Sequence, residues 1–189
     1  MPKLWNETID AHRAAVREAI LDTTAQLVAE GGLRAVTMSQ IADRVGIGRA
    51  TLYKYFSDAE AVLFAWHERQ VSEHLRQLEG IGDQGGTAAE RLTALLQAYA
   101  GIARRRHGGE SAALLHQGEH ITHAERHLQS MLEPLVSEAA AVGDLRGDVP
   151  PGELVQYCLH ALTAAAGLTS EAAVGRLVAV TLDGLRPVP

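Results

Sequence analysis

Cysteine is nearly absent from this chain of 189 residues, and aromatic residues make up only 4% of it. Because a disulfide needs two thiols, the lone Cys158 excludes a disulfide within the chain and is typical of a reducing compartment. No signal peptide is visible, and no apolar run reaches the roughly 18 residues that a membrane-spanning helix needs. We therefore expect a cytoplasmic protein without a membrane partner.

The chain also lacks an excess of basic charge. Its 17 lysine and arginine residues are outnumbered by 23 aspartate and glutamate residues, and the net charge of −6 argues against indiscriminate binding to nucleic acid. Enzyme signatures are missing too: there is no nucleophile elbow, phosphate-binding loop or C-x-x-C pair, and Cys158 lies in an apolar helical pattern where a thiol is unreactive. We expect a protein that is not an enzyme and needs no cofactor.

Helical patterns account for most of what remains. An apolar content of 47% with few aromatic residues suits packed helices, and the length is enough for one sizeable core or two small ones. Most of the aromatic residues lie in one short window, so the front of the chain needs a core of its own; they are Tyr53, Tyr55, Phe56, Phe64 and Trp66. The sequence predicts an all-α fold with two domains, over residues 13–73 and 87–187.

The stretch from Thr37 to Leu63 organises the first of these domains. Thr37 and Gln40 have the spacing of a capping box, which satisfies the first free N–H groups of a helix. Gly46-Ile47-Gly48 ends that helix, because glycine adopts the left-handed backbone of a helix C-terminus. A second helix is expected over residues 49–56. Helix, tight turn and helix together form the supersecondary unit that reads DNA.

The second helix has an apolar and a polar side. Leu52 and Phe56 lie one turn apart and face inward, which leaves Ala50 and Lys54 on the opposite side. The window of residues 44–57 carries three basic residues and no acidic one, although the whole chain is acidic. A surface that faces phosphates needs such a window. However, short helices with glycine turns and a few solvated charges occur in any small helical domain.

These residues resemble the helix-turn-helix signature of TetR-type (tetracycline-repressor-like) transcriptional regulators. The resemblance covers about the first third of the chain and rests on Thr37, Ile41-Ala42, Val45-Gly46-Ile47 and Thr51-Leu52-Tyr53-Lys54-Tyr55-Phe56, followed by Glu60 and Leu63. Two positions depart from it. Ala50 stands where glycine is common, and Ala59 stands where the family has a lysine that contacts a phosphate. One anchor on the DNA backbone is therefore missing.

The resemblance implies a transcriptional regulator, most often a repressor, that binds a palindromic operator in double-stranded DNA as a homodimer. It implies that Arg49 and Lys54 reach base edges in the major groove and that Ala50 contacts a thymine methyl group. Other residues hold phosphates and fix the register without reading sequence; they are Thr37, Ser39, Thr51, Tyr53 and Tyr55.

Capping signals and glycines divide the rest of the chain. Three further pairs have capping-box spacing and predict helix starts: Ser57 and Glu60, Thr87 and Glu90, and Thr122 and Glu125. Residues 1–7 are expected to form a flexible arm. The glycine-rich segment 80–86 is expected to be a flexible joint between the two domains.

The last two helices, over about residues 151–186, are apolar nearly all round, and their apolar residues cannot all face one core. Two interpretations remain open. The pair is buried in the centre of a monomer, or it is half of a four-helix interface between two chains, in which small residues such as Ala161, Ala172 and Gly175 permit close approach. Because palindromic operators demand two-fold symmetric readers, the helix-turn-helix motif favours the homodimer.

The regulatory half of the molecule follows from the resemblance alone. Members of the family bind a small, often apolar effector in the C-terminal domain and, through the long helix after Ser57, change the separation of their two DNA-binding heads. The sequence does not identify the effector. Leu96, Tyr99, His127 and Met131 are candidates for the lining of the ligand pocket, and equally for the ordinary core.

Histidines supply the main alternative, a small helical metal-binding protein or a metallohydrolase. His116, Glu119 and His120 match H-x-x-E-H, a zinc-hydrolase pattern in which two histidines hold the ion and the carboxylate acts as a base. Gly118 interrupts the helix that such a site needs, and the capping box at Thr122 places the later histidines on a different helix. We therefore expect no metal, and histidines that border a pocket or face solvent.

Overall fold

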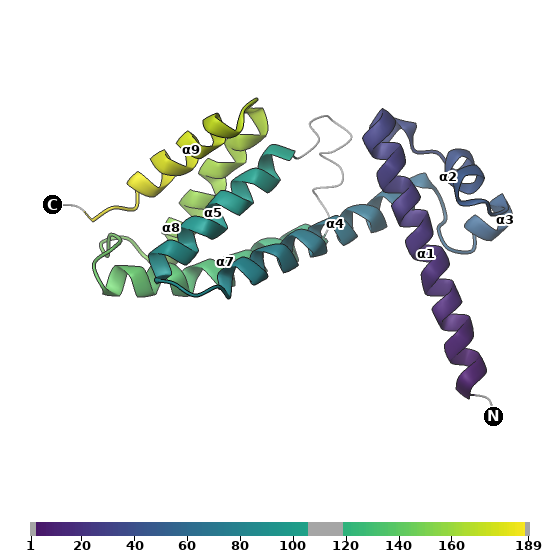
Figure 1. The fold of residues 1–189 in the computed structure, drawn as a ribbon, viewed down its shortest axis with the longest axis horizontal. Coiled ribbons are helices and arrows are strands. Elements are labelled where there is room, and N and C mark those ends of the chain that lie inside the picture. Colours follow the sequence, from purple (N-terminus) through teal and green to yellow (C-terminus); the bar gives the residue numbers. More distant parts are fainter. Residues whose placement is uncertain (1–2, 106–118, 188–189) are drawn as a thin grey trace. The chain divides into compact units, whose positions relative to one another are not determined.

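The computed structural model describes residues 3–105 and 119–187, with side chains for residues 9–105 and 120–187. Every regular element of this described part is a helix (Figure 1), which confirms the predicted all-α fold. With η for 3-10 helices, the elements are α1 (Lys3–Gly31), η1 (Leu33–Ala35), α2 (Met38–Val45), α3 (Arg49–Leu52), α4 (Ala59–Gly82), α5 (Ala88–Arg105), α7 (Glu119–Ala141), α8 (Pro151–Thr163), η2 (Ala164–Gly167) and α9 (Glu171–Asp183).

Two compact units make up the chain, and the boundary between them falls between Gln70 and Val71, inside α4. We call the described residues before this boundary the head and those after it the body. The two halves of α4 therefore belong to different cores.

The head is built around one apolar core that α1, α2, α3 and the first half of α4 share. Its fully buried side chains include Ile20 of α1, Ile41 of α2, Leu52 of α3 and Val62 of α4. Aromatic residues complete this core or pack against it; they are Phe56, Trp66, Tyr55 and Phe64. Four of the five aromatic residues of the window thus contribute to a separate core at the front of the chain, as the sequence predicts, whereas Tyr53 stays exposed.

α1 extends well beyond the head core. The helix already begins at Lys3, so the flexible arm expected over residues 1–7 is wrong for residues 3–7. Every side chain from Ile9 to Ala15 is exposed, and Val16 is the first described side chain that packs against the core. At 1.5 Å per residue, the helix from Lys3 to Val16 is roughly 20 Å long.

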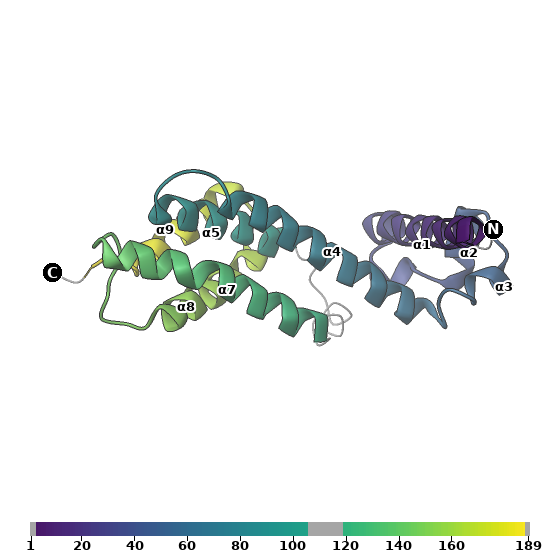
Figure 2. The ribbon, with the colours of Figure 1, turned by 90° about the horizontal axis from the view of Figure 1, so that it is seen from below.

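In the body, α5 packs against α7, α8, η2 and α9 (Figure 1 and Figure 2). Fully buried side chains from three of these helices meet in its core; they include Leu92, Leu95 and Leu96 of α5, Leu132 and Val136 of α7, and Leu162 of α8. An ion pair of 3.1 Å between Arg91 Nη2 and Glu138 Oε2 adds a link between α5 and α7.

Two of the predicted helix starts are confirmed by hydrogen bonds. At α2 the Gln40 N–H donates to Thr37 Oγ1 at 3.3 Å. At α5 the exchange is reciprocal: the Glu90 N–H donates to Thr87 Oγ1 at 3.2 Å, and the Thr87 N–H donates to Glu90 Oε2 at 2.9 Å. The capping box at α5 is therefore complete.

The other two predicted starts are wrong. Asp58, and not Ser57, caps α4, because the Ala61 N–H donates to Asp58 Oδ1 at 2.8 Å. The charged carboxylate is the better partner for the positive end of a helix, and the Ser57 hydroxyl donates to Asp58 Oδ2 at 2.9 Å. α7 already begins at Glu119, so Thr122 lies inside the helix and does not cap it.

The glycine-rich segment 80–86 lies inside the body rather than between the domains. α4 continues through its first residues to Gly82, and the residues on either side of the segment, Leu78 and Ala88, are both buried in the body core. Gly82 lies against α5, because a Cβ added to it would be in ordinary van der Waals contact with Leu95 Cδ1 at 3.6 Å. Among the described helices, none combines the length and apolar character that crossing a membrane requires.

The last two helices each have one buried side. Pro151 begins α8, and Ser170 caps α9 through its hydroxyl, which accepts the Ala173 N–H at 3.2 Å. Burial in this core raises the pKa of the Cys158 thiol to about 12, so the thiol stays protonated and unreactive, as expected. On the opposite sides Tyr157 is 45% exposed and Val180 is 65% exposed.

Candidate nucleic-acid interface

The N-terminus of α2 presents two of the predicted phosphate contacts. Thr37 has an extended backbone, and its hydroxyl accepts the Gln40 N–H while it donates to Gln40 Oε1 at 2.8 Å. Thr37 is exposed and Ser39 is half-buried. The free N–H groups of a helix N-terminus and its dipole favour a phosphate at this position.

Gly46 ends α2 and starts the turn toward α3. Its φ of 76° lies in the left-handed region, and the N–H groups of Gly46 and Ile47 both donate to the Ala42 carbonyl, at 3.0 and 3.1 Å. Gly48 then precedes α3 with an ordinary extended backbone. The turn predicted from the glycines is thus confirmed, and it places α3 directly after α2 in the chain reversal of a helix-turn-helix unit.

The second helix of the unit is shorter than predicted. Its α-helical part, α3, covers only Arg49–Leu52, and turns over residues 53–55 replace the expected helix to Phe56. The Lys54 N–H donates to Thr51 O at 3.0 Å, and the Tyr55 N–H donates to Leu52 O at 2.9 Å. These two bonds join residues three apart, as in a 3-10 helix, while the Phe56 N–H still donates to Leu52 O four residues back at 3.1 Å, so the segment mixes both patterns.

The sidedness of this segment is nevertheless the predicted one. Leu52 is fully buried and Phe56 is 8% exposed, because both face the head core. The predicted DNA contacts on the other side are exposed; they are Arg49, Ala50, Thr51, Tyr53 and Lys54. Tyr53 has 55% of its surface exposed, so it is accessible to a partner. Tyr55 differs, since it is half-buried and packs against the head core.

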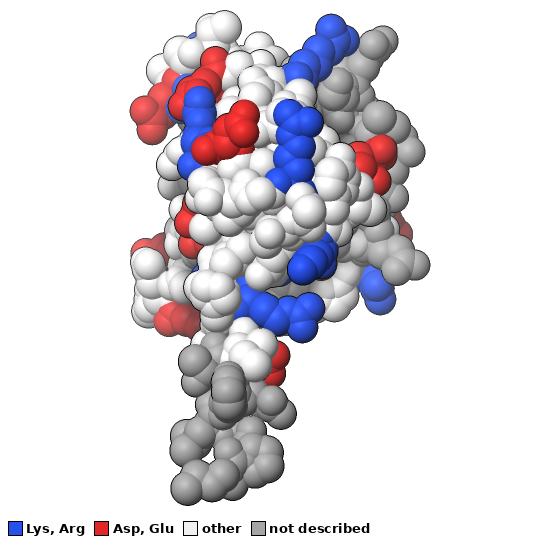
Figure 3. Space-filling view, turned by 90° about the vertical axis from the view of Figure 1, so that its right-hand side faces the viewer, with Lys and Arg blue, Asp and Glu red and all other residues white. Residues whose placement is uncertain are grey.

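Ion pairs modify the cationic window of residues 44–57. Arg44 Nη1 lies 2.8 Å from both carboxylate oxygens of Glu30, so Arg44 links α2 to α1 and its charge is balanced. Among the described residues, Arg49 and Lys54 form no such pair. Lys and Arg side chains are spread over the face of the head that Figure 3 shows. Arg49 and Lys54 are therefore the cations of the window that remain available to phosphates or base edges.

The N-terminus of α4 offers no cation. Ala59 is half-buried where the resembled family has a lysine, and the carboxylate of Asp58 occupies the helix end. The hydrogen bond from the Ala61 N–H, with the one from Ser57, lowers the pKa of Asp58 below its ordinary value. The sequence contains a signal for this cap, since aspartate is as good a capping residue as serine, but the Ser57/Glu60 spacing obscured it.

The four predicted pocket residues all lie in the body. Leu96 is fully buried in its core, and Tyr99 and Met131 are half-buried and pack against that core. His127 is half-buried on α7, with its Nε2 atom 2.7 Å from Glu79 Oε1 on α4. Both residues belong to the body, so this contact ties α7 to the second half of α4 within one unit, which no sequence signal indicated.

The histidine alternative finds no support in the described residues. His116 lies outside them, as does the side chain of Glu119, while His120 is half-buried on α7. The histidines at 120, 123 and 127 share this one helix, contrary to the expected break at Thr122. Within the part of the chain that is described, no three His, Cys, Asp or Glu side chains are placed so that they could hold a metal ion.

Two family models match the chain. Residues 20–66 match bacterial regulatory proteins of the tetR family, and this range includes every predicted DNA contact. Residues 88–187 match the C-terminal domain of SbtR-like transcriptional regulators. The second match alone spans more than half of the chain.

Curated relatives match over shorter stretches. The fatty acid metabolism regulator protein of Bacillus subtilis is 25% identical over 80 residues, which are 42% of this chain and 41% of that protein. The HTH-type transcriptional repressor KstR of Mycobacterium tuberculosis is 33% identical over 76 residues, which are 40% of this chain and 34% of that protein. The matched part is thus well under two thirds of either relative.

Solved structures match over nearly the whole chain. A TetR/AcrR-family transcriptional regulator from Thermobifida fusca is 27% identical with a TM-score of 0.78, and the match covers 90% of this chain and 98% of that one. AibR in complex with isovaleryl coenzyme A and operator DNA is 20% identical with a TM-score of 0.62, over 90% and 97% of the two chains, and shows the shared fold. With both of its domains matched, the chain belongs to the tetR family of bacterial regulatory proteins, which are DNA-binding transcriptional regulators and not enzymes.

Proposed function

We propose that this protein is a ligand-responsive transcriptional repressor that binds a palindromic operator as a homodimer. The observation that carries the proposal is the exposed side of α3 and the following turn. There Arg49, Ala50, Thr51, Tyr53 and Lys54 are all exposed, while Leu52 and Phe56 anchor the segment in the head core. A short helix presented in this way fits the major groove of DNA.

The residue roles follow from side-chain chemistry. We assign Arg49 and Lys54 to base edges, since their cationic groups form no ion pair with a described residue and can donate to guanine, and Ala50 to a thymine methyl group. Ser39, Thr51 and Tyr53 donate to phosphates and fix the register, and Thr37 does so when its hydroxyl exchanges Gln40 Oε1 for a phosphate oxygen. We also assign Tyr55 to the phosphate contacts. Because this residue packs against the head core, its hydroxyl is the group that we expect to reach a phosphate.

Selection of binding sites from random duplex DNA tests the proposal. We expect an enriched sequence with two-fold symmetry, whose half-sites lie about one helical turn or a multiple of it apart, because one dimer presents two copies of α3. Enrichment of a sequence without symmetry contradicts the homodimeric reader. Absence of any enrichment at low ionic strength contradicts sequence-specific DNA binding altogether.

The homodimer is proposed to form through α8 and α9. Each has one side buried in the body core and an opposite side on which Tyr157 and Val180 are exposed. Small exposed residues also lie on α9; they are Ala172, Gly175 and Ala179. Two such pairs can approach closely and form a four-helix interface. Sedimentation at micromolar concentration tests this, and a monomeric mass contradicts it.

The effector is proposed to bind in the body, near Leu96, Tyr99, His127 and Met131. A ligand that favours one separation of the two heads by a few kcal/mol is enough to release an operator. Acyl-coenzyme A is the first class to test, because AibR, a protein of the same fold, holds isovaleryl coenzyme A. We expect one member of this class to raise the melting temperature and to release operator DNA. We place the repressor in the cytoplasm, where its operator is.

A further inference from the structure

We propose that α1 carries a second DNA-binding surface, in which Arg13 and Arg17 bind phosphates beside the base pairs that α3 reads. The inference rests on the proposed function, since it takes duplex DNA as the partner of the head. It adds residues that lie outside the helix-turn-helix unit and before the residues 20–66 that match the tetR model.

The first observation is the projection of α1 beyond the head core. Side chains from Ile9 to Ala15 are all exposed, and none of these described side chains packs against the core. The roughly 20 Å of helix from Lys3 to Val16 equal the length of about six base-pair steps of 3.4 Å. A helix of this length next to α3 can reach phosphates outside the base pairs that α3 contacts.

The second observation is the direction of the two arginines. Residues spaced three and four apart lie on one side of a helix, so Arg13 and Arg17 continue the stripe that Ile20 and Thr24 bury in the core. Arg17 confirms this direction, because its Cζ atom lies 5.6 Å from the centre of the Phe56 ring. Arg17 therefore lies at the end of the segment that carries Lys54, and Arg13 lies one helical turn further out.

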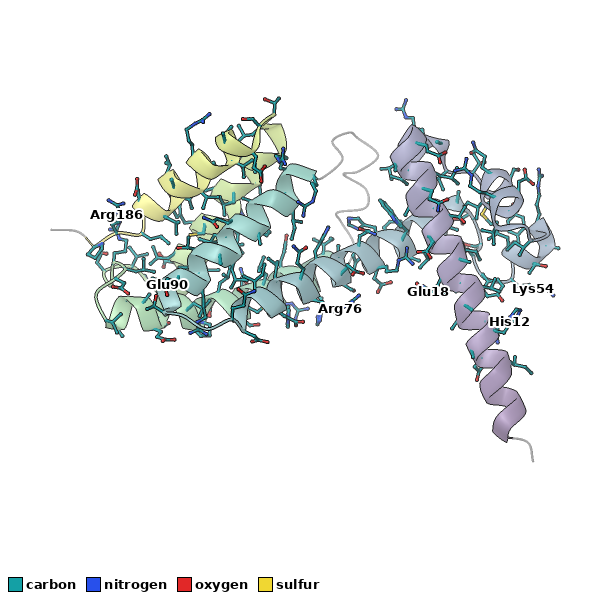
Figure 4. The ribbon with its side chains drawn as sticks, in the orientation of Figure 1. His12, Glu18, Lys54, Arg76, Glu90 and Arg186 are labelled. Carbon is teal, nitrogen blue, oxygen red and sulfur yellow. The ribbon has the colours of Figure 1, made fainter. Side chains whose placement is uncertain are left out.

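The third observation is the separation of charges around α1. Glu18 and Asp22 point away from this surface, and both are paired with Arg69 Nη1, at 2.8 and 2.9 Å. Figure 4 shows Glu18 on one side of α1, and His12 and Lys54 on the other. Arg69 thus offsets part of the acidic charge of α1 on the side away from this surface.

Together these observations make duplex DNA the partner that fits. The basic side chains of the head continue toward the base of the projecting helix in Figure 3. Arg17 Nη1 also lies 3.8 Å from Glu18 Oε1, but this distance is long for an ion pair, and the other carboxylate oxygen of Glu18 binds Arg69 at 2.8 Å. Asp10 is the acidic residue on the outer, described part of the helix, and it opposes the contact. The two arginines outnumber this one opposing carboxylate, and guanidinium groups bind phosphates bidentately, so a phosphate is still favoured on this surface.

The experiment measures operator binding by full-length protein and three variants. Arg13→Ala removes the outer guanidinium and keeps a strong helix former, Asp10→Asn removes the opposing charge, and Arg76→Ala is the control. Arg76 is exposed on α4 in the body and pairs with Glu73 three residues away (Figure 4), so its removal deletes one positive charge elsewhere. Circular dichroism and sedimentation establish that each variant keeps its fold and assembly.

We expect Arg13→Ala to weaken binding to all duplexes by a similar factor and to reduce the slope of log affinity against log salt by about 0.9 per lost phosphate contact. Asp10→Asn is expected to strengthen binding, and Arg76→Ala to leave it unchanged. If Arg13→Ala and Arg76→Ala behave alike, the inference is wrong.

A scan of the operator with uncharged methylphosphonate linkages locates the contact. At a phosphate outside the base pairs that α3 reads, neutralisation should weaken binding of the wild-type protein but not of Arg13→Ala. If no phosphate shows this dependence on Arg13, the second surface does not exist, although the proposed function stands. If the wild-type protein enriches and binds no duplex at all, the proposed function and this inference both fall.

Discussion

Gly46 shows how one backbone conformation shapes the helix-turn-helix unit. Its φ of 76° lies in the left-handed region, whereas Gly48, two residues later, has a φ of −66° that any residue adopts. A Cβ in the left-handed region costs roughly 1–2 kcal/mol. At Gly48 the nearest atom to an added Cβ is Thr51 Oγ1 at 3.9 Å, so space is available there.

Alanine substitution of the two glycines should therefore give unequal results. We expect Gly46→Ala to lower the free energy of unfolding of the head by about 1–2 kcal/mol, and Gly48→Ala to change it by less than about 0.5 kcal/mol. Urea unfolding followed by tryptophan fluorescence measures both, because Trp66 lies in the head core. Equal effects of the two substitutions would show that the left-handed turn does not determine the stability of the head.

Arg49 and Tyr53 separate base reading from phosphate binding. Arg49→Ala should cost about 1–3 kcal/mol of operator affinity and relax the preference at one base pair of each half-site. Tyr53→Phe removes one hydroxyl donor and should weaken all duplexes alike. Titration of a panel of single-base operator variants measures both. The division of roles is wrong if Tyr53→Phe alters the preferred sequence.

At the scale of the helix, the N-terminus of α4 depends on Asp58. Its carboxylate accepts the Ala61 N–H at 2.8 Å and the Ser57 hydroxyl at 2.9 Å. These bonds favour the ionised form and lower the pKa of Asp58, mainly through the backbone bond. Because the folded pKa is the lower one, the stabilisation is complete above the ordinary pKa of aspartate and is lost as the pH falls through the folded value.

Asp58→Ala should accordingly lower the melting temperature at neutral pH, and its difference from the wild-type protein should shrink as the pH approaches the lowered pKa of Asp58. Ser57→Ala keeps the cap and should have the smaller effect. Thermal unfolding of the three proteins between neutral and acidic pH measures this. A difference that stays constant down to the lowest pH would contradict an ionised cap.

Helix boundaries also show where local signals suffice. Thr37 and Thr87 cap their helices as predicted, because a capping box involves only residues three apart. Ser57 and Thr122 have the same spacing to a glutamate three residues later, but neither of them caps its helix. The carboxylate of Asp58 caps α4 in place of Ser57, and Thr122 already lies inside α7. Spacing alone does not rank competing acceptors.

At the scale of the whole molecule, we propose that two chains form a dimer through the exposed sides of α8 and α9. Val180 on α9 is 65% exposed, and Val142 after α7 is 70% exposed, so neither is needed to hold its own chain together. The two valines therefore form a matched pair, one on the proposed interface and one away from it.

Val180→Glu should raise the dimer dissociation constant by about 100-fold or more, because it places an unpaired charge in the interface of each chain. Operator affinity should fall with it, since one head binds only one half-site. Val142→Glu should change neither quantity. Sedimentation over a range of concentrations measures the dissociation constants, and equal behaviour of the two variants would place the interface elsewhere.

The sequence alone determined four features of the protein. They are the all-α fold, the turn at Gly46, the inward direction of Leu52 and Phe56, and the exposed contacts of α3. Each of these depends on residues within about one or two helical turns, whose spacing decides which side chains share a face. The order of residues is therefore enough to place the DNA-reading segment on the surface of the head.

Tertiary structure alone decided which charges and apolar residues remain available. Arg44 is taken by Glu30, 14 residues away, and Arg69 by Glu18, 51 residues away. It also decided that α1 projects past its core and that Val180, but not Val178, stays exposed. Burial and ion pairing depend on which distant segments meet in space, and periodicity along one helix carries no information about its partner.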